Sequence, residues 1–164
     1  MNTFKEIANE DTIDYLVARI GDCAAIYDTN LFNLLRKFAG DIYDGGLWVV
    51  REYPNGAFAY IFPEDTIIPN VNHPNMQNVQ CSLEAASYAA NLFLLTALAE
   101  HLIEKGNEEL AEKLLNYHQA LSDALAGRMV SICDMGSWRE PTPEELALPR
   151  EIYPERAAIQ AMIN

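Results

Sequence analysis

Residues 41–63, DIYDGGLWVVREYPNGAFAYIFP, contain two strand-like runs joined by a turn. The runs 46–53 and 57–62 are rich in the β-branched and aromatic residues that suit a half-buried sheet surface. Asn55 and Gly56 between them both tolerate the positive φ of a tight turn. The segment therefore predicts a β-hairpin with an aromatic face.

Aromatic side chains alternate along this hairpin, among them Trp48, Tyr53 and Tyr60. One aromatic face is most often buried in the core. The alternative is that Tyr53 and Tyr60 lie on the opposite face and form a contact surface. Interleaved basic residues are too few for RNA stacking, so such a surface favours a protein partner.

Helical periodicity and capping residues predict the rest of the secondary structure. Ser82 can cap a long helix, and Thr142 to Glu145 form a capping box with a proline at the first helical position. The turn-rich segment 63–80 predicts a long loop, with one more strand near 66–68 or near Val79. The expected helices are 11–20, 29–39, 82–105, 108–127 with an extension to Ile132 left open, a short one at 142–145, and a last one after Pro154.

The order of these elements predicts an α+β fold, because the strands cluster and do not alternate with helices. We expect a small antiparallel sheet built on the hairpin and packed against several helices. Helices 82–105 and 108–127 are joined by a short turn, so they should form a long antiparallel helical hairpin. We expect one domain over residues 1–164, with 137–164 as a C-terminal extension packed on it.

The charge and the cysteine content argue against some classes of function and of site. The formal net charge is −13, from 24 acids and 11 bases, which argues against direct nucleic-acid binding. It permits docking onto a basic surface, including the DNA channel of a nucleic-acid-binding enzyme. Three widely spaced cysteines without a C-x-x-C pair favour buried reduced thiols over a disulfide framework or zinc site.

Hydropathy predicts a cytoplasmic protein without a membrane segment. The N-terminal residues MNTFKEIANED contain early acids and no long apolar run, unlike a secretory signal. The apolar stretch between Glu84 and Glu100 is shorter than a spanning helix of about 20 residues, and it is interrupted by polar residues. We therefore expect it to be a buried core helix.

No arrangement of reactive residues indicates a catalytic, cofactor or metal site. His101 and His118 should differ in height along the helical hairpin by about 9 Å, too far apart for one metal ion. Cys81 precedes a helix N-terminus, but no glycine-rich oxyanion element follows it. The remaining enzyme hypothesis is a small hydrolase that uses Asp41, Asp44, His73 or Cys81.

Several blocks of sequence resemble a known family. The pattern Tyr43-x-Gly45-Gly46-x-Trp48, then Asn55-Gly56-x-Phe58 and an apolar strand ending at Pro63, is similar to the ArdB/KlcA antirestriction protein family. The family's Ser-x-Glu-Ala-Ala helix start is matched by Ser82-Leu83-Glu84-Ala85-Ala86. The resemblance covers residues 28–117. The tail after Ser137 has no counterpart, and Val49-Val50-Arg51 replaces a more aromatic strand.

The resemblance implies a compact α+β domain that inhibits type I restriction–modification systems and protects incoming plasmid, phage or mobile-element DNA. It implies binding without catalysis, with a type I restriction enzyme or another host DNA-processing protein as partner. DNA mimicry is a minor alternative for the mechanism, and a mobile-element interaction protein unrelated to restriction is an alternative function. The oligomeric state stays open. The candidate interaction surface comprises Asp41, Tyr43, Asp44, Trp48, Tyr53 and Asn55.

Overall fold

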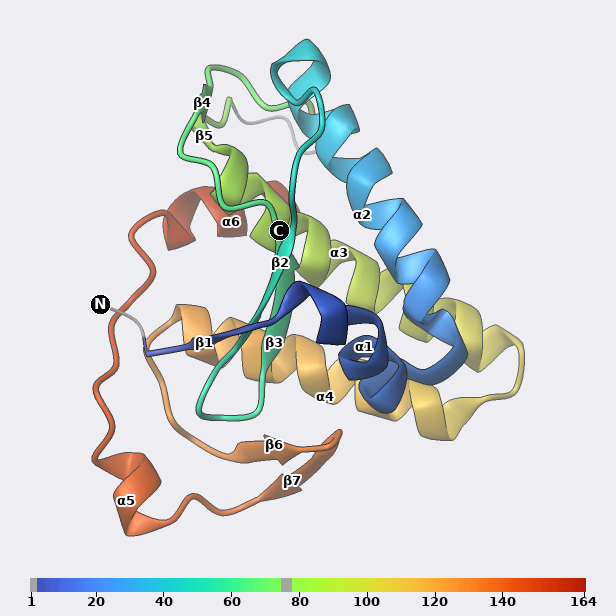
Figure 1. The fold of residues 1–164 in the computed structure, drawn as a ribbon, viewed down its shortest axis with the longest axis vertical. Helices are drawn as coiled ribbons and strands as arrows, with labels where there is room; N and C mark the ends of the chain where they lie inside the picture. The colour runs from blue at the N-terminus through green and yellow to red at the C-terminus, as the bar shows by residue number, and fades with distance from the viewer. Residues whose placement is uncertain (1–2, 75–77) are drawn as a thin grey trace.

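The computed structural model describes residues 3–74 and 78–164 and confirms the α+β class. The predicted hairpin is present as strands β2 (Val49–Glu52) and β3 (Phe58–Ile61). A third strand, β1 (Lys5–Ile7), pairs with the other side of β2 and places Ile7 opposite Val50. The main sheet is antiparallel in the order β1-β2-β3 (Figure 1).

The extra strand predicted near 66–68 exists but belongs to a different sheet. Strand β4 (Ile67–Ile68) pairs with β5 (Cys81–Ser82), just before the long helix begins. Val79 is not in a strand, although its carbonyl accepts a hydrogen bond from the Val71 amide at 2.9 Å. Part of the predicted loop 63–80, residues 75–77, lies outside the described residues.

The hairpin turn differs from the prediction in one residue. Gly56 has a φ of +84°, but Asn55 does not have a positive φ, because Met135 is the one such non-glycine residue in the described chain. The Asn55 side chain is instead buried. Its amide nitrogen donates to the Ala120 carbonyl at 2.8 Å, and its oxygen accepts from the Ala57 amide at 3.1 Å. Asn55 therefore fixes the turn to the helical half.

The N-terminal helices follow the expected apolar periodicity. A short 3-10 turn (Asn9–Asp11) leads into α1 (Thr12–Ile20), and a second (Gly21–Cys23) leads into α2 (Ala24–Ala39). Helix α2 begins earlier than the predicted 29–39, because its buried stripe extends back to Ala24 and Tyr27. A third 3-10 turn (Gly40–Ile42) follows α2.

The antiparallel helical hairpin is present as α3 (Leu83–Glu104) and α4 (Glu108–Leu125). The Ser82 hydroxyl accepts from the Ala85 amide and caps α3, and the Asn107 side chain caps α4 in the same way. Helix α4 does not extend to Ile132. The chain instead forms a second hairpin from β6 (Ile132–Asp134) and β7 (Ser137–Arg139).

The tail crosses the molecule and returns to α3. The predicted capping box opens the short helix α5 (Pro143–Leu146), and the last helix is α6 (Arg156–Ile163). Figure 1 shows the tail passing along the side of the sheet opposite α1 and α2, after which α6 lies against the first half of α3.

Helix α3 is the centre of the fold. It contacts α2, α4, α6 and β3 (Figure 1). With 22 residues α3 is long and apolar enough to span a membrane, so its length does not exclude a spanning helix, contrary to the expectation; however, 61% of its apolar window is buried inside the protein. This burial is typical of a core helix and agrees with the prediction.

Two polar side chains of α3 bind the outer edge of β3. Asn91 is fully buried; its oxygen accepts from the Tyr60 amide at 2.9 Å, and its nitrogen donates to the Tyr60 carbonyl at 2.7 Å. The Ser87 hydroxyl accepts from the Phe62 amide at 3.1 Å. The Tyr27 hydroxyl donates to the same Asn91 oxygen at 2.5 Å. Asn91 thus pairs with β3 as a neighbouring strand would.

Replacing Asn91 tests this pairing. We expect Asn91→Leu, which keeps the volume similar, to lower the free energy of unfolding by at least about 3 kcal/mol, because buried groups left without partners cost about 1–3 kcal/mol each. Urea unfolding followed by circular dichroism measures the change. Thr96→Val on the same helix is the control and should cost about 0.5 kcal/mol or less. Equal losses for the two variants would contradict the assignment.

Gly56 provides a second test, because the chain offers a matched glycine. A Cβ at Gly56 would lie 1.9 Å from the Cys133 carbonyl oxygen, whereas one at Gly106 (φ +81°) would meet nothing within 4 Å. We expect Gly106→Ala to cost about 1–2 kcal/mol from backbone strain alone. Gly56→Ala should cost at least about 3 kcal/mol, because the β6–β7 hairpin must also move. Similar urea midpoints for the two variants would show that the hairpin does not pack closely here.

Candidate interaction surface

The six predicted surface residues divide into two groups. Asp41 and Asp44 are exposed. Tyr43, Trp48, Tyr53 and Asn55 are only 5%, 3%, 5% and 2% exposed. The structure therefore places these four side chains in the core. The alternative in which Tyr53 and Tyr60 form an exposed face is wrong, since Tyr60 is buried as well.

The Tyr43–Trp48 pair explains the aromatic motif in structural terms. The Trp48 indole nitrogen donates to the Tyr43 hydroxyl at 2.9 Å, so the buried N–H has a partner. The Trp48 ring also packs edge-on against Phe32 of α2, with 5.0 Å between ring centroids. The motif thus fixes the segment before β2 against α2.

The residues exposed around the Tyr43–Trp48 pair belong to the turn that precedes β2. Asp41, Ile42, Asp44 and Leu47 are all exposed, Leu47 by 65%. We call these four residues the loop patch. Carboxylates beside exposed aliphatic groups can contact a partner that is partly basic and partly apolar. Of the predicted interaction surface, only Asp41 and Asp44 are exposed, and both belong to the loop patch.

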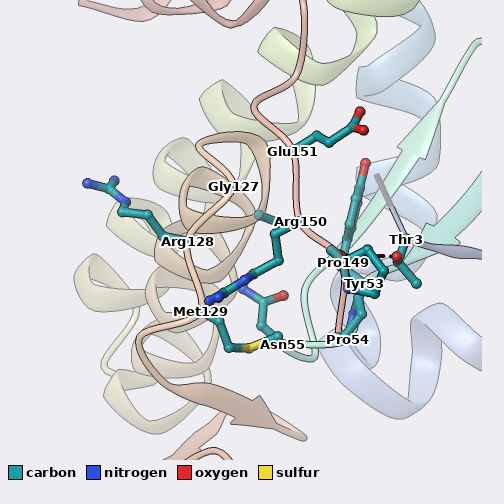
Figure 2. Close-up of a pocket in the computed structure, with 11 residues that line it drawn as sticks. Thr3, Tyr53, Pro54, Asn55, Gly127, Arg128, Met129, Pro149, Arg150 and Glu151 are labelled. Carbon is teal, nitrogen blue, oxygen red and sulfur yellow. Dashed lines mark hydrogen bonds between the residues drawn. The ribbon is translucent and has the colours of Figure 1, made fainter. Parts of the chain in front are cut away.

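Tyr53 and Asn55 line a hollow between the hairpin turn, the end of α4 and the tail (Figure 2). On its rim the Thr3 hydroxyl donates to the Pro149 carbonyl at 3.1 Å. The hollow has a volume of only about 20 Å³. This is room for about one water molecule, so it is not a ligand site.

The Tyr53 hydroxyl belongs to a buried polar network between the sheet and α3. It lies 2.6 Å from the Tyr88 hydroxyl, which accepts a hydrogen bond from Arg51 at 3.1 Å. Arg51 also pairs with Glu84 at 2.9 Å, and Glu84 accepts from the Tyr153 hydroxyl at 2.9 Å. Burial raises the pKa of Tyr53 and of Tyr153, so both hydroxyls remain neutral. The network joins β2, α3 and the tail.

An acidic hollow lies at the start of α3. It has a volume of about 440 Å³ and is lined by Glu64, Asp65, Glu84 and Glu155 among others. The Glu155 carboxylate accepts from both the amide and the hydroxyl of Ser82, at 2.8 and 2.5 Å. Glu155 therefore occupies the anion-binding position at this helix N-terminus and anchors the tail.

The residues of the hydrolase hypothesis do not form an activated cluster. Cys81 is buried in β5, and burial raises the pKa of its thiol to about 12, opposite to the shift of a reactive cysteine. Asp41 and Asp44 are on the exposed turn, and His73 is half-buried in the loop. Within residues 3–74 and 78–164, no group of His, Cys, Asp and Glu is arranged to hold a metal ion.

Sequence reasoning missed a polar pocket beside the hairpin turn. Arg19 of α1, Glu52 of β2, Tyr117 of α4, and Asp134 and Arg139 of the β6–β7 hairpin line it. These residues lie on separate elements far apart in the chain. The one local signal was Gly136 between two strand-like runs, which is typical of a hairpin.

The ion pair of the pocket residue Arg139 with Glu145 predicts how the Glu145 carboxyl titrates. Arg139 donates to both Glu145 carboxylate oxygens at 2.8 Å, and this pairing, helped by the Thr142 amide, lowers the pKa of Glu145 to about 2. Because the folded-state pKa is depressed, the pairing stabilises the tail above pH 4.5, the ordinary value, and is lost as the pH falls through about 2. Carboxyl ¹³C NMR should give that midpoint, and Arg139→Met should raise it toward 4.5. An unchanged midpoint would contradict the pairing.

Comparison with solved structures gives an informative match. No protein-family model matches the chain, and no curated protein matches it. A solved structure reported for the KlcA and ArdB proteins has 20% sequence identity and a TM-score of 0.68. The match covers 99% of this chain and 94% of that chain, so it includes the tail after Ser137, which was expected to lack a counterpart. Those proteins are described as having a novel fold and antirestriction activity against type I DNA restriction systems in vivo but not in vitro. The present chain therefore has the ArdB/KlcA fold.

Proposed function

We propose that this protein is an antirestriction protein that inhibits type I restriction–modification systems. It would act in the cytoplasm and protect incoming plasmid, phage or mobile-element DNA. The observation that carries the proposal is the shared fold over nearly the whole of both chains, together with the activity described for KlcA and ArdB. The motif blocks at Tyr43–Trp48 and Ser82–Ala86 support it independently.

Binding is the mode of action that the geometry supports best. The raised pKa of Cys81 and the exposed positions of Asp41 and Asp44 do not favour a nucleophile or a general base. The formal net charge of −13 instead favours association with a basic protein surface, and it would speed the encounter at low salt.

Exposed acids lie at several places on the molecule, and two of the clusters they form are far apart in the chain from the loop patch. One is the turn between α3 and α4, and the other is the tail (Figure 1). A mimic of duplex DNA would need charges repeated along a rod, about one per 1.7 Å of axis. Separate clusters on a folded core favour local contact with a partner over imitation of a duplex. The helical-tip cluster is Glu100, Glu104, Glu108, Glu109 and Glu112, and the tail cluster is Glu140, Glu144 and Glu151.

Phage plating in a restricting host tests the proposal. Expression of the protein should raise the plating efficiency of unmodified phage toward that of modified phage in a host with a type I system. The assay is done in cells, because the activity of KlcA and ArdB is described in vivo but not in vitro. A host without the system is the control. Unchanged restriction at good expression of folded protein would favour the mobile-element alternative.

The same assay tests the acidic clusters. We expect Glu→Gln replacement throughout the helical-tip cluster or the tail cluster to reduce protection, while the urea midpoint changes little because these side chains are exposed. Full protection by both variants would exclude docking through these charges.

A further inference from the structure

The pocket beside the hairpin turn contains a polar group that the fold leaves without a partner. The pocket has a volume of about 260 Å³ and lies between Arg19, the turn at Gly56, Tyr117 and the β6–β7 hairpin. Tyr117 is fully buried, and its hydroxyl has no hydrogen-bond partner within residues 3–74 and 78–164. Such a group costs free energy of folding unless something binds to it.

Tyr117 lines this pocket, and charged groups of the same lining act on its hydroxyl. Its ring packs edge-on against Phe58 in the core, 5.0 Å between centroids. Burial raises the pKa of the hydroxyl, and the groups that further shift it are Cys133, Arg19, Asp134 and Glu52, all of which line the pocket. The hydroxyl is therefore neutral and able to donate or accept a hydrogen bond.

The two arginines of the pocket are engaged by internal partners. Arg19 donates to the Tyr15 carbonyl and to Glu52, and its guanidinium lies 3.4 Å from the centre of the Tyr15 ring. Arg139 is held by Glu145 through two hydrogen bonds of 2.8 Å. Because of these internal partners, neither guanidinium is free to bind an incoming anion.

The carboxylates of the pocket have spare capacity as acceptors. Asp134 is 65% exposed in its side chain, and its Oδ2 lies 3.9 Å from Arg139 Nε, too far for a hydrogen bond. Glu52 Oε1 lies 3.6 Å from the ammonium group of Lys5, again beyond hydrogen-bond length. The lining holds two arginines and two carboxylates; because both arginines are engaged internally, the carboxylate lone pairs that remain favour a ligand rich in hydrogen-bond donors.

We propose that this pocket binds a guanidinium group, namely an arginine side chain presented by a partner protein. A planar guanidinium can donate to Glu52, Asp134 and the Tyr117 oxygen together. The volume is below that of pockets for drug-sized ligands and suits the end of one side chain. The choice of a partner protein as the source rests on the proposed function, whereas guanidinium binding does not.

Titration with capped amino acids tests the binding. N-acetyl-L-arginine amide should cause saturable ¹⁵N–¹H shifts at Gly56, Cys133 and Asp134. Its neutral analogue, N-acetyl-L-citrulline amide, should bind at least about tenfold more weakly, since it lacks the charge. Equal binding of the two probes, saturable shifts with acetate but not arginine, or no saturable shift at all would overturn the proposal.

Two variants separate the pocket from general stability. Tyr117→Phe removes only the hydroxyl and should weaken arginine binding about three- to tenfold without lowering the urea midpoint. Asp134→Asn should weaken it similarly. Unchanged affinity in Tyr117→Phe would mean that the hydroxyl serves only a water molecule, which contradicts its assigned role.

The source of the guanidinium is tested separately. Free arginine that binds about tenfold more tightly than the capped form would assign the pocket to an amino acid and overturn the partner assignment. In the plating assay Asp134→Asn should lose protection, and full protection would also overturn that assignment. If the wild-type protein gives no protection, the proposed function fails while the titration still decides the pocket.

Discussion

The pairing of Asn91 and Ser87 with the outer edge of β3 is the interaction on which the rest of this structure depends. A three-stranded sheet has two edges, and the edge of β3 faces the interior, where unpaired backbone groups are costly. Side chains of α3 satisfy that edge in place of a fourth strand. The remaining surface of α3 is then free to contact α2, α4 and α6, so one helix organises both halves of the chain.

This arrangement explains why the aromatic motif is internal. Once β3 is held against α3, Trp48 and Tyr43 pack between the sheet and α2, and Tyr53 joins the network of Arg51 and Tyr88. The motif residues thus maintain the fold shared with KlcA and ArdB. Surfaces that remain available for a partner include the loop patch, the acidic clusters and the pocket at Tyr117.

Elements with strong local signals could be predicted from the sequence. Ser82 and Thr142 each cap a helix where the capping pattern places one, and the hairpin around Asn55-Gly56 is present. Strands β1 and β7 have three residues each, too few to show an alternating pattern, and pairing with distant segments decides their conformation. Alternation of aromatic residues also cannot show which face is buried, so Tyr43, Trp48 and Tyr53 were expected on a surface. The pocket at Tyr117 joins several elements, and no sequence spacing encodes it.

Native-state hydrogen exchange tests the role of α3 most directly. The amides of Tyr60 and Phe62 point away from β2 and donate to Asn91 and Ser87. If this pairing holds the fold together, both amides should exchange only through global unfolding, with protection equal to the full free energy of unfolding. Exchange as fast as that of amides in exposed turns would show that β3 has an open edge, and would contradict the central position of α3.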